Sequence, residues 1–287
     1  MSTHEETLSA GSHVDESIVF EPDSQSVLAL GDIMDGLRKS PIWMMLAYQD
    51  IKLRYRRSIL GPLWLTLSMA ITIYTMGYIY SHIFHTDMAD YFPYLTGGML
   101  GWTLISTIVL EFTDGLANSE HMIKQIKLPY SLYIHRIAAR NIMIFFHNIL
   151  VMVPILIVYH ESAQVNLNTL LLLPGLMIVY LNALTYGLML AMVGARYRDI
   201  SQIIKSMVQV VFFITPVMWK PEALLGKNHY IVELNPFYSF IELIRAPLLG
   251  KAPALYNIEF VAITTVVGIL AAWIAFVRRR SRIVYWL

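Results

Sequence analysis

Long stretches without a charged side chain run through this sequence and limit the folds that it can adopt. One runs from Ser162 to Ala195 and another from Ser206 to Trp219, and neither contains Lys, Arg, Asp or Glu. Only 14% of the 287 residues are charged, against about a quarter in soluble domains. So few charges cannot cover the surface of a soluble fold of this size. The sequence therefore predicts an all-α integral membrane protein.

The apolar stretches are long enough for six membrane-spanning helices, because a helix needs about 20 mostly apolar residues to cross the hydrocarbon. The fifth stretch crosses only if Lys205 extends its amine to the lipid headgroups. We place the six spans at about 62–84, 91–112, 140–160, 169–194, 200–219 and 259–277.

The Lys and Arg residues indicate which connections face the cytoplasm, where such residues are in excess. Of the 21 in the chain, all fall on one side of the six-span arrangement except Lys220, Lys227, Arg245 and Lys251. We therefore expect a multi-pass protein with both termini in the cytoplasm. Residues 1–35 contain no Lys or Arg and many carboxylates, which predicts a largely disordered acidic tail and excludes a signal peptide.

Residues 40–57 predict an amphipathic helix at the membrane surface. Ser40 can cap it and Pro41 suits the first helical position. At helical spacing, one stripe contains Met44, Tyr48, Ile51 and Tyr55. The opposite half contains Gln49, Asp50, Lys52, Arg54, Arg56 and Arg57. Such a helix lies in the headgroup plane with its aromatic face toward the hydrocarbon.

Two cytoplasmic connections carry charge that a simple tether would not need. Residues 113–136 link the second and third spans, and we expect a short helix at 118–127, ended by Pro129, that docks into a partner. The turn after the fourth span contains Arg196, Arg198 and Asp199. An alternative for this turn is that its arginines only fix the topology.

Residues 220–257 form the only long outer segment, and we expect them to fold as short helices re-entering the membrane. Asn235 can cap a helix that begins with Pro236, and Glu242 and Arg245 can pair at i,i+3. The predicted helical pieces are 222–225 and 236–248. If exposed, the pair contributes only roughly 0.2–0.5 kcal/mol. Packing of Phe237 and Phe240 should then hold most of the structure.

At these places the chain resembles the transmembrane subunits of ABC exporters for bacterial polysaccharides, the family that handles O-antigen, capsule and teichoic acid. The resemblance covers about residues 40–287. The matching pieces are RYRRSILGPLW at 54–64, KLPYSLY at 127–133, ARYRDI at 195–200, TPVMW at 215–219, NPF at 235–237 and YWL at 285–287.

The resemblance implies a transport subunit of the bacterial inner membrane that is not itself an enzyme. It also implies a homodimer, bound to two copies of a nucleotide-binding ATPase subunit that uses ATP and Mg²⁺. In agreement, the chain contains no G-x-x-x-x-G-K-[ST] sequence that could hold ATP phosphates. We expect no cofactor and no metal bound by this chain, and its formal net charge of +1 gives no support for nucleic-acid binding.

The expected cargo is a lipid-linked polysaccharide, with O-antigen on undecaprenyl diphosphate as the first choice. Arg54, Arg56 and Arg57 would attract the diphosphate, or alternatively only anchor the helix in membrane lipids. The residues expected to receive the ATPase stroke are Lys124, Lys127, Pro129, Arg196, Arg198 and Asp199. The residues expected to form the outer gate are Asn235, Pro236, Phe237, Phe240, Glu242 and Arg245.

Four aromatic residues, Tyr74, Tyr78, Trp102 and Phe112, could hold sugar rings by stacking along a channel. The alternative is that they form the ordinary interfacial belt of membrane helices. Two other functions also stay open: a permease for a small hydrophobic compound or lipid, and a membrane-embedded transferase acting on a lipid-linked sugar.

Overall fold

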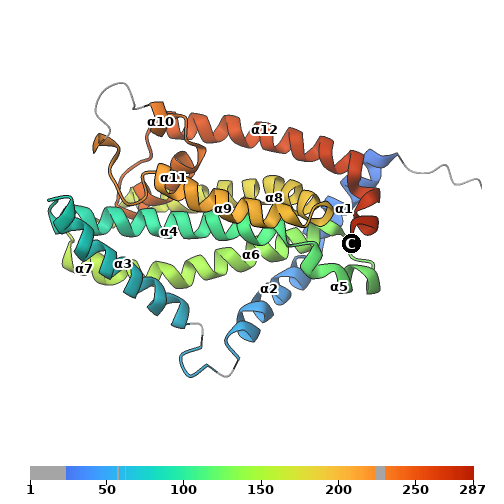
Figure 1. Ribbon diagram of the computed structural model, residues 1–287, viewed down its shortest axis with the longest axis horizontal. Coiled ribbons are helices and arrows are strands. Elements are labelled where there is room, and N and C mark those ends of the chain that lie inside the picture. The colour runs from blue at the N-terminus through green and yellow to red at the C-terminus, as the bar shows by residue number, and fades with distance from the viewer. Residues whose placement is uncertain (1–23, 57, 62, 224–229) are drawn as a thin grey trace, which may run out of the picture.

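Five helical segments are long and apolar enough to cross a membrane in the computed structural model, which describes residues 24–56, 58–61, 63–223 and 230–287. All regular secondary structure in these residues is helical, which confirms the predicted all-α class. The helices form an elongated bundle (Figure 1). The five segments are Leu63–Ile83, Met88–Thr113, Tyr130–Val158, Leu167–Arg196 and Leu255–Trp286.

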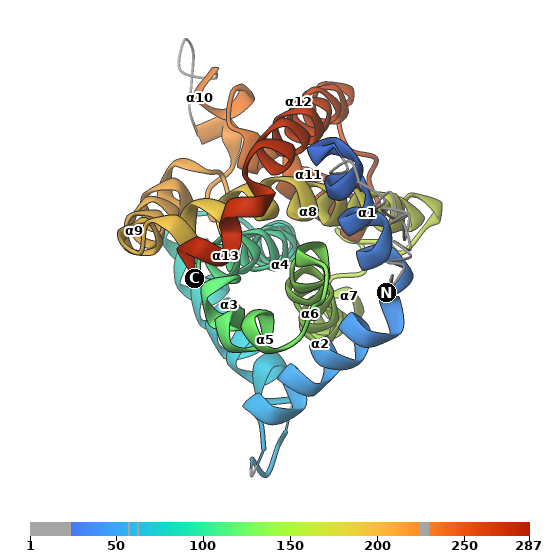
Figure 2. The same ribbon diagram turned by 90° about the vertical axis from the view of Figure 1, so that its right-hand side faces the viewer.

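These segments contain the main helices of the bundle. They are α3 (Leu63–Ile83), α4 (Met88–Thr113), α6 (Tyr130–Asn148), α7 (Met152–Val158), α8 (Leu172–Arg196) and α12 (Leu255–Arg279). Short 3-10 turns at Ile149–Val151 and Leu167–Leu171 extend the third and fourth segments. Shorter helices surround the main ones, and they include α1 (Gln25–Arg38), α2 (Ser40–Arg54), α5 (Glu120–Gln125), α10 (Tyr230–Glu233), α11 (Pro236–Leu248) and α13 (Ile283–Trp286). Of these, α1, α5 and α13 lie at the end that holds the C-terminus (Figures 1 and 2).

The segment predicted as the fifth span, 200–219, folds as α9, Asp199–Ile214. Its 16 residues reach about 24 Å, which is shorter than the hydrocarbon thickness of roughly 30 Å. Thr215 ends the helix in extended backbone. Six spans therefore stay a prediction, with five helices of sufficient length among the described residues.

The helix that contains the predicted third span begins ten residues before it, because α6 starts at Tyr130. Arg136 and Arg140 made this part of the sequence too polar for a span. In the fold both arginines form ion pairs with carboxylates of neighbouring helices. Pairing lowers the cost of placing charge at the end of a membrane helix, so the helix continues through them.

Helix α4 is the centre of the bundle and packs against α3, α6, α8, α9 and α11. Asp87 begins it by accepting a hydrogen bond from the Ala89 N–H at 3.1 Å. Two glycines permit close approach of its neighbours. A Cβ on Gly98 would lie 2.8 Å from the Val217 carbonyl oxygen, and one on Gly194 of α8 would lie 1.8 Å from that of Thr113. Small residues at helix contacts are typical of membrane bundles.

Residues 25–35 are helical, so the prediction that the whole tail 1–35 is disordered is wrong for this part. Helix α1 packs on α6 and α12 with Ala29, Asp32 and Gly36 buried. In the fold Asp32 accepts hydrogen bonds from the backbone N–H groups of Tyr130 and Ser131, both at 3.0 Å. Residues 1–23 lie outside the described residues.

Asp32 caps α6 from another helix. Pro129, the residue before α6, has no side chain that could accept from the free N–H groups of the first turn. The guanidinium of Arg280, after α12, also donates to Asp32 at 3.2 Å. Asp32 thus joins the N-terminal helix, the start of α6 and the end of α12.

We expect Asp32→Asn to release α1 from the bundle. Hydrogen bonds to a charged acceptor contribute about 1.5–3 kcal/mol. Their loss should therefore raise the fraction of molecules in which α1 is detached from the bundle roughly tenfold or more. The chain contains no cysteine, so Ala29→Cys provides a single reporter at this buried contact. Maleimide labelling of that cysteine should accelerate in Asp32→Asn and stay unchanged in the control Asp35→Asn, which alters an exposed carboxylate of the same helix. Equal labelling rates would show that Asp32 does not hold α1.

Helix α2 confirms the predicted helix, but Ser40 is its first residue and not its cap, because Lys39 holds the N-cap position without a side-chain hydrogen bond. The helix ends at Arg54, with Tyr55 and Arg56 in a turn. Met44 and Tyr48 are exposed, as the predicted apolar stripe requires. Ile51 is instead buried, and Asp50 points at arginines of α6. The predicted outward face is therefore wrong for these two residues, because the ion pairs of Asp50 turn this side of α2 toward the bundle.

Candidate functional site

A polar cavity of about 380 Å³ lies where the ends of α2, α4, α6 and α9 meet. Four cationic side chains and two carboxylates contribute to its wall, so it is unlike the apolar interior around it. The charged lining residues are Arg54, Arg136, Arg140, Lys205, Glu111 and Asp114.

Asp50 fixes the two arginines of α6 behind this wall. Arg136 donates through Nε at 2.8 Å and Nη2 at 2.5 Å, and Arg140 donates through Nη1 at 2.6 Å. Burial acts to raise the pKa of Asp50, but these hydrogen bonds and charges outweigh it and hold the pKa below its usual range. Asp50 therefore remains ionised at physiological pH. The bidentate geometry makes this a structural pair.

Glu111 connects the same network to α2. It accepts from Arg140 Nη2 at 2.8 Å and from Asn141 Nδ2 at 2.6 Å. Its other oxygen accepts from Arg54 Nη2 at 3.2 Å. The negative charge near the end of α4 is therefore bound by α2 and α6, and it holds the mouth of the cavity at one geometry.

Arg54 and Lys205 are the cations with free capacity for a ligand. Their side chains are 47% and 51% exposed. Lys205 reaches only one described carboxylate, that of Asp114, at 3.9 Å. Arg140 also retains an Nε without a hydrogen-bond partner among the described residues. An anion at the cavity could therefore receive hydrogen bonds without breaking the Asp50 pairs.

Of the three arginines predicted to meet a headgroup, the structure places Arg54 in the cavity. Arg56 is exposed in the turn after α2 and does not belong to the described cavity wall, and Arg57 lies outside the described residues. Sequence reasoning missed Arg136, Arg140 and Lys205 as partners of Arg54. The i,i+4 spacing of Arg136 and Arg140, which places both on one helix face, was the available signal.

The connection between α4 and α6 contains a short helix, as predicted, in the form of a 3-10 turn at Ala117–Ser119 followed by α5. The helix ends at Gln125, and Pro129 stands directly before α6. Lys124 donates to Glu120 at 2.7 Å, and both side chains are exposed. Lys127 is also exposed. These residues form a charged surface at one tip of the bundle (Figure 1).

The turn between α8 and α9 lies beside this tip. The hydrogen bond from Lys124, and to a smaller extent the charge of Arg198, lowers the pKa of Glu120. Arg196 stacks over Tyr197 at 4.9 Å and over Trp286 at 5.7 Å, measured from Cζ to the ring centroid. Asp199 begins α9, where a carboxylate favours the helix dipole. The structure thus brings the two predicted coupling segments together with the C-terminus.

The opposite end of the bundle contains α11, which begins as predicted. Asn235 accepts from the N–H groups of Phe237 and Tyr238 at 3.0 and 3.4 Å, and Pro236 occupies the first turn. The Asn235 amide also donates to Thr215 at 2.9 Å. Helix α11 packs against α4, α8 and α12. Of the predicted piece 222–225, the first two residues end a 3-10 turn, Pro221–Ala223, and residues 224–229 lie outside the described residues.

The Glu242–Arg245 pair is buried, so the expectation of a weak exposed pair is wrong. The side chain of Arg245 is 1% exposed and that of Glu242 15%. Arg245 Nε donates to Glu242 at 2.8 Å and Nη1 to the Pro216 carbonyl at 2.9 Å. Its guanidinium also lies 4.0 Å from the centroid of the Tyr94 ring. Arg245 therefore joins α11 to α4 and to the segment after α9.

The four predicted channel aromatics have different surroundings. Tyr74 donates its hydroxyl to the Val151 carbonyl at 3.0 Å, and Tyr78 is exposed. Trp102 is buried against Phe212 and Phe237, with ring centroids 5.3 and 6.0 Å apart. Phe112 is fully buried. Within one chain, Trp102 and Phe112 are therefore buried, and the stacking role predicted for the four aromatic residues stays a prediction.

Known proteins resemble this chain over the region that contains these features. The profile of a family described as ABC-2 type transporter matches residues 42–249. The chain is 22% identical over 202 residues to the O-antigen export system permease protein RfbA of Myxococcus xanthus, covering 68% of this chain and 75% of that protein. A protein of the same name from Klebsiella pneumoniae is 20% identical over 231 residues, covering 79% and 86%.

Proposed function

Because this chain belongs to the ABC-2 type transporter family, we propose that it is the permease that exports a lipid-linked polysaccharide, with O-antigen on undecaprenyl diphosphate as the cargo. As a permease of this family it is an integral membrane protein and a transport component. The names of its relatives support the glycan. The polar cavity supports the lipid diphosphate.

The cavity is the observation that carries the proposal. Four cations face three carboxylates there once Asp50 is included, and Arg54 and Lys205 are only partly engaged. A diphosphate is a strong acceptor, and charge-assisted hydrogen bonds from Arg and Lys recognise it well. The cavity lies, in this proposal, at the headgroup level of the membrane. In this proposal Arg54 binds the cargo headgroup, and Arg136 and Arg140 hold the site in shape.

The tip formed by α5 would then face the cytoplasm and receive the ATPase. This orientation places both termini on the cytoplasmic side of the inner membrane, following the distribution of Lys and Arg. The complex we propose is a homodimer with two ATPase subunits, which bind the ATP and Mg²⁺ while this chain binds no cofactor. At the other end, α11 with its buried Arg245 would close the outer mouth of the channel.

Replacing Lys124 and Lys127 by Glu should weaken association with the ATPase at least tenfold, since both cations are exposed at the α5 tip. Co-purification of the tagged ATPase with the full-length permease measures this. The matched control is Lys251→Glu, an exposed lysine beyond α11, which should leave the complex intact. Undiminished co-purification of the double variant would remove the proposed docking role. Failure of the wild-type chain to bind any ATPase would remove the proposed function.

A further inference from the structure

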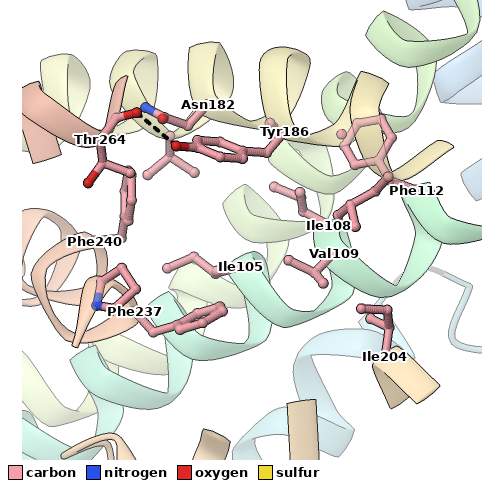
Figure 3. Close-up of a pocket in the computed structure, with 15 residues that line it drawn as sticks. Ile105, Ile108, Val109, Phe112, Asn182, Tyr186, Ile204, Phe237, Phe240 and Thr264 are labelled. Atoms are coloured by element: carbon pink, nitrogen blue, oxygen red, sulfur yellow. Dashed lines mark hydrogen bonds between the residues drawn. The ribbon is translucent and has the colours of Figure 1, made fainter. Parts of the chain in front are cut away.

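A second cavity, of about 410 Å³, lies on the other side of α4 from the polar site, and its lining is almost entirely apolar (Figure 3). Helices α4, α8, α9, α11 and α12 all contribute to it, and it is partly open to the surface of the chain. Its apolar lining includes Ile108, Val109, Leu190, Ile204, Phe237 and Phe240.

One corner of this cavity is polar. Figure 3 shows the Asn182 amide, the Tyr186 hydroxyl and Thr264 near one another there. Asn182 is only 7% exposed, and its Oδ1 has no hydrogen-bond partner among the described residues. The orientation of the amide follows from its neighbours, because Nδ2 lies 2.9 Å from the Ile178 carbonyl, which can only accept. Oδ1 is therefore an unpaired acceptor near the middle of α8.

Every donor in this corner is already used. The second bond of Asn182 Nδ2 goes to Thr265 Oγ1 at 2.7 Å. The Tyr186 hydroxyl donates to the Thr264 carbonyl at 2.9 Å. The hydroxyls of Thr264 and Thr265 donate to carbonyls one turn earlier in α12, at 2.8 and 2.7 Å. The corner therefore offers acceptors only, and a ligand must bring the donor.

We propose that this cavity binds a long-chain alcohol, with its hydrocarbon chain against α4 and α9 and its hydroxyl donating to Asn182 Oδ1. Esters and ethers bring only acceptors and would leave Oδ1 unpaired. An unpaired acceptor that is buried weakens binding roughly tenfold. The hydrocarbon chains of bulk lipid bring no donor either, so they would also leave Oδ1 unpaired. The site is separate from the headgroup cavity, so the proposal does not depend on the exported cargo.

The test uses the purified full-length chain in nanodiscs and two photoreactive probes, geranylgeraniol with a diazirine group and the methyl ether of the same molecule. The alcohol should bind roughly tenfold more tightly than the ether, with cross-links in residues 105–112 and 182–190. A second pair of probes, linear hexadecanol with a diazirine group and its methyl ether, shows whether the site prefers a branched or a linear chain. Equal binding of alcohol and ether in both pairs would overturn the proposal and leave a water molecule as the partner of Asn182.

Two pairs of variants test whether the alcohol binds in this cavity and donates to Asn182. Asn182→Val should abolish the preference for the alcohol. Its control is Asn148→Val, which removes another buried asparagine with an unpaired Oδ1, one that does not line this cavity. Ile204→Trp should fill the cavity and reduce labelling at least tenfold, whereas Ile203→Trp, on the exposed side of α9, should not. Because Ile204 is only partly buried, this pair keeps the test decisive if Asn182→Val does not fold. Equal labelling of the two tryptophan variants would also overturn the proposal.

Discussion

Reversing the charges of Arg54 and Lys205 together, by replacing both with Glu, is expected to reduce export at least tenfold at normal protein level. Both side chains face the polar cavity and about half of each is exposed. Two unit charges 4 Å apart interact with about 4 kcal/mol near a protein surface, and a tenfold effect needs about 1.4 kcal/mol. Exposed ion pairs contribute about 0–1 kcal/mol to folding. The variant should therefore fold and lose cargo binding.

The matched control for this experiment is Arg56→Glu, an exposed arginine two residues from Arg54 that does not belong to the described cavity wall. It should export normally, although its position in the sequence suggests the same role as that of Arg54. The measurement is the amount of surface glycan in cells that carry each variant. Full export by the Arg54 and Lys205 double variant, or equal loss in both variants, would contradict the assignment of the cavity to the cargo headgroup.

Replacing Arg245 by Met is expected to lower the free energy of unfolding by about 3–5 kcal/mol. The side chain of Arg245 is 1% exposed, and it joins Glu242 to the Pro216 carbonyl and the Tyr94 ring. Its removal leaves the largely buried Glu242 with an uncompensated charge, and it removes one of two donors to the Pro216 carbonyl, which also accepts from the Tyr94 hydroxyl at 3.2 Å. Because α11 would lose the contact of Arg245 with Tyr94 of α4, we also expect liposomes that contain the variant to leak ions.

A double variant separates burial of an unpaired charge from loss of packing. Glu242→Gln combined with Arg245→Met removes both charges, and it should recover part of the stability lost in Arg245→Met alone. Thermal unfolding in detergent, followed by the fraction of monodisperse protein, measures both. If Arg245→Met unfolds at the wild-type temperature and its liposomes stay tight, the pair does not hold α11 and the outer seal lies elsewhere.

The parts of the fold that could be predicted from sequence are those with a local cause. Asn235 followed by Pro236 specifies the start of α11 by capping, and the apolar runs specify the long helices. The short helix before Pro129 also follows from residues close together in the chain. In each case the partners are a few residues apart, so the pattern contains the information.

The errors concern residues whose partners are distant in sequence. Asp32 is helical and buried because it caps α6 almost one hundred residues later, and Asp50 faces the bundle because Arg136 and Arg140 do. Arg245 is buried because Tyr94 and Pro216 surround it. Without those partners, a charge in a sequence suggests a solvated face. The polar cavity likewise needed α2, α4, α6 and α9 to be placed together.

Transport of a lipid-linked glycan by the reconstituted complex would show whether this chain is the permease for that cargo. The full-length chain and its ATPase are placed in liposomes with an undecaprenyl diphosphate-linked glycan, and a lectin inside the liposomes captures glycan that crosses. We expect ATP-dependent capture, reduced at least tenfold when Arg54 and Lys205 are both replaced by Glu and unchanged in Arg56→Glu. An assembled complex that hydrolyses ATP, moves a small hydrophobic compound and leaves the lipid-linked glycan where it started would contradict the proposed function.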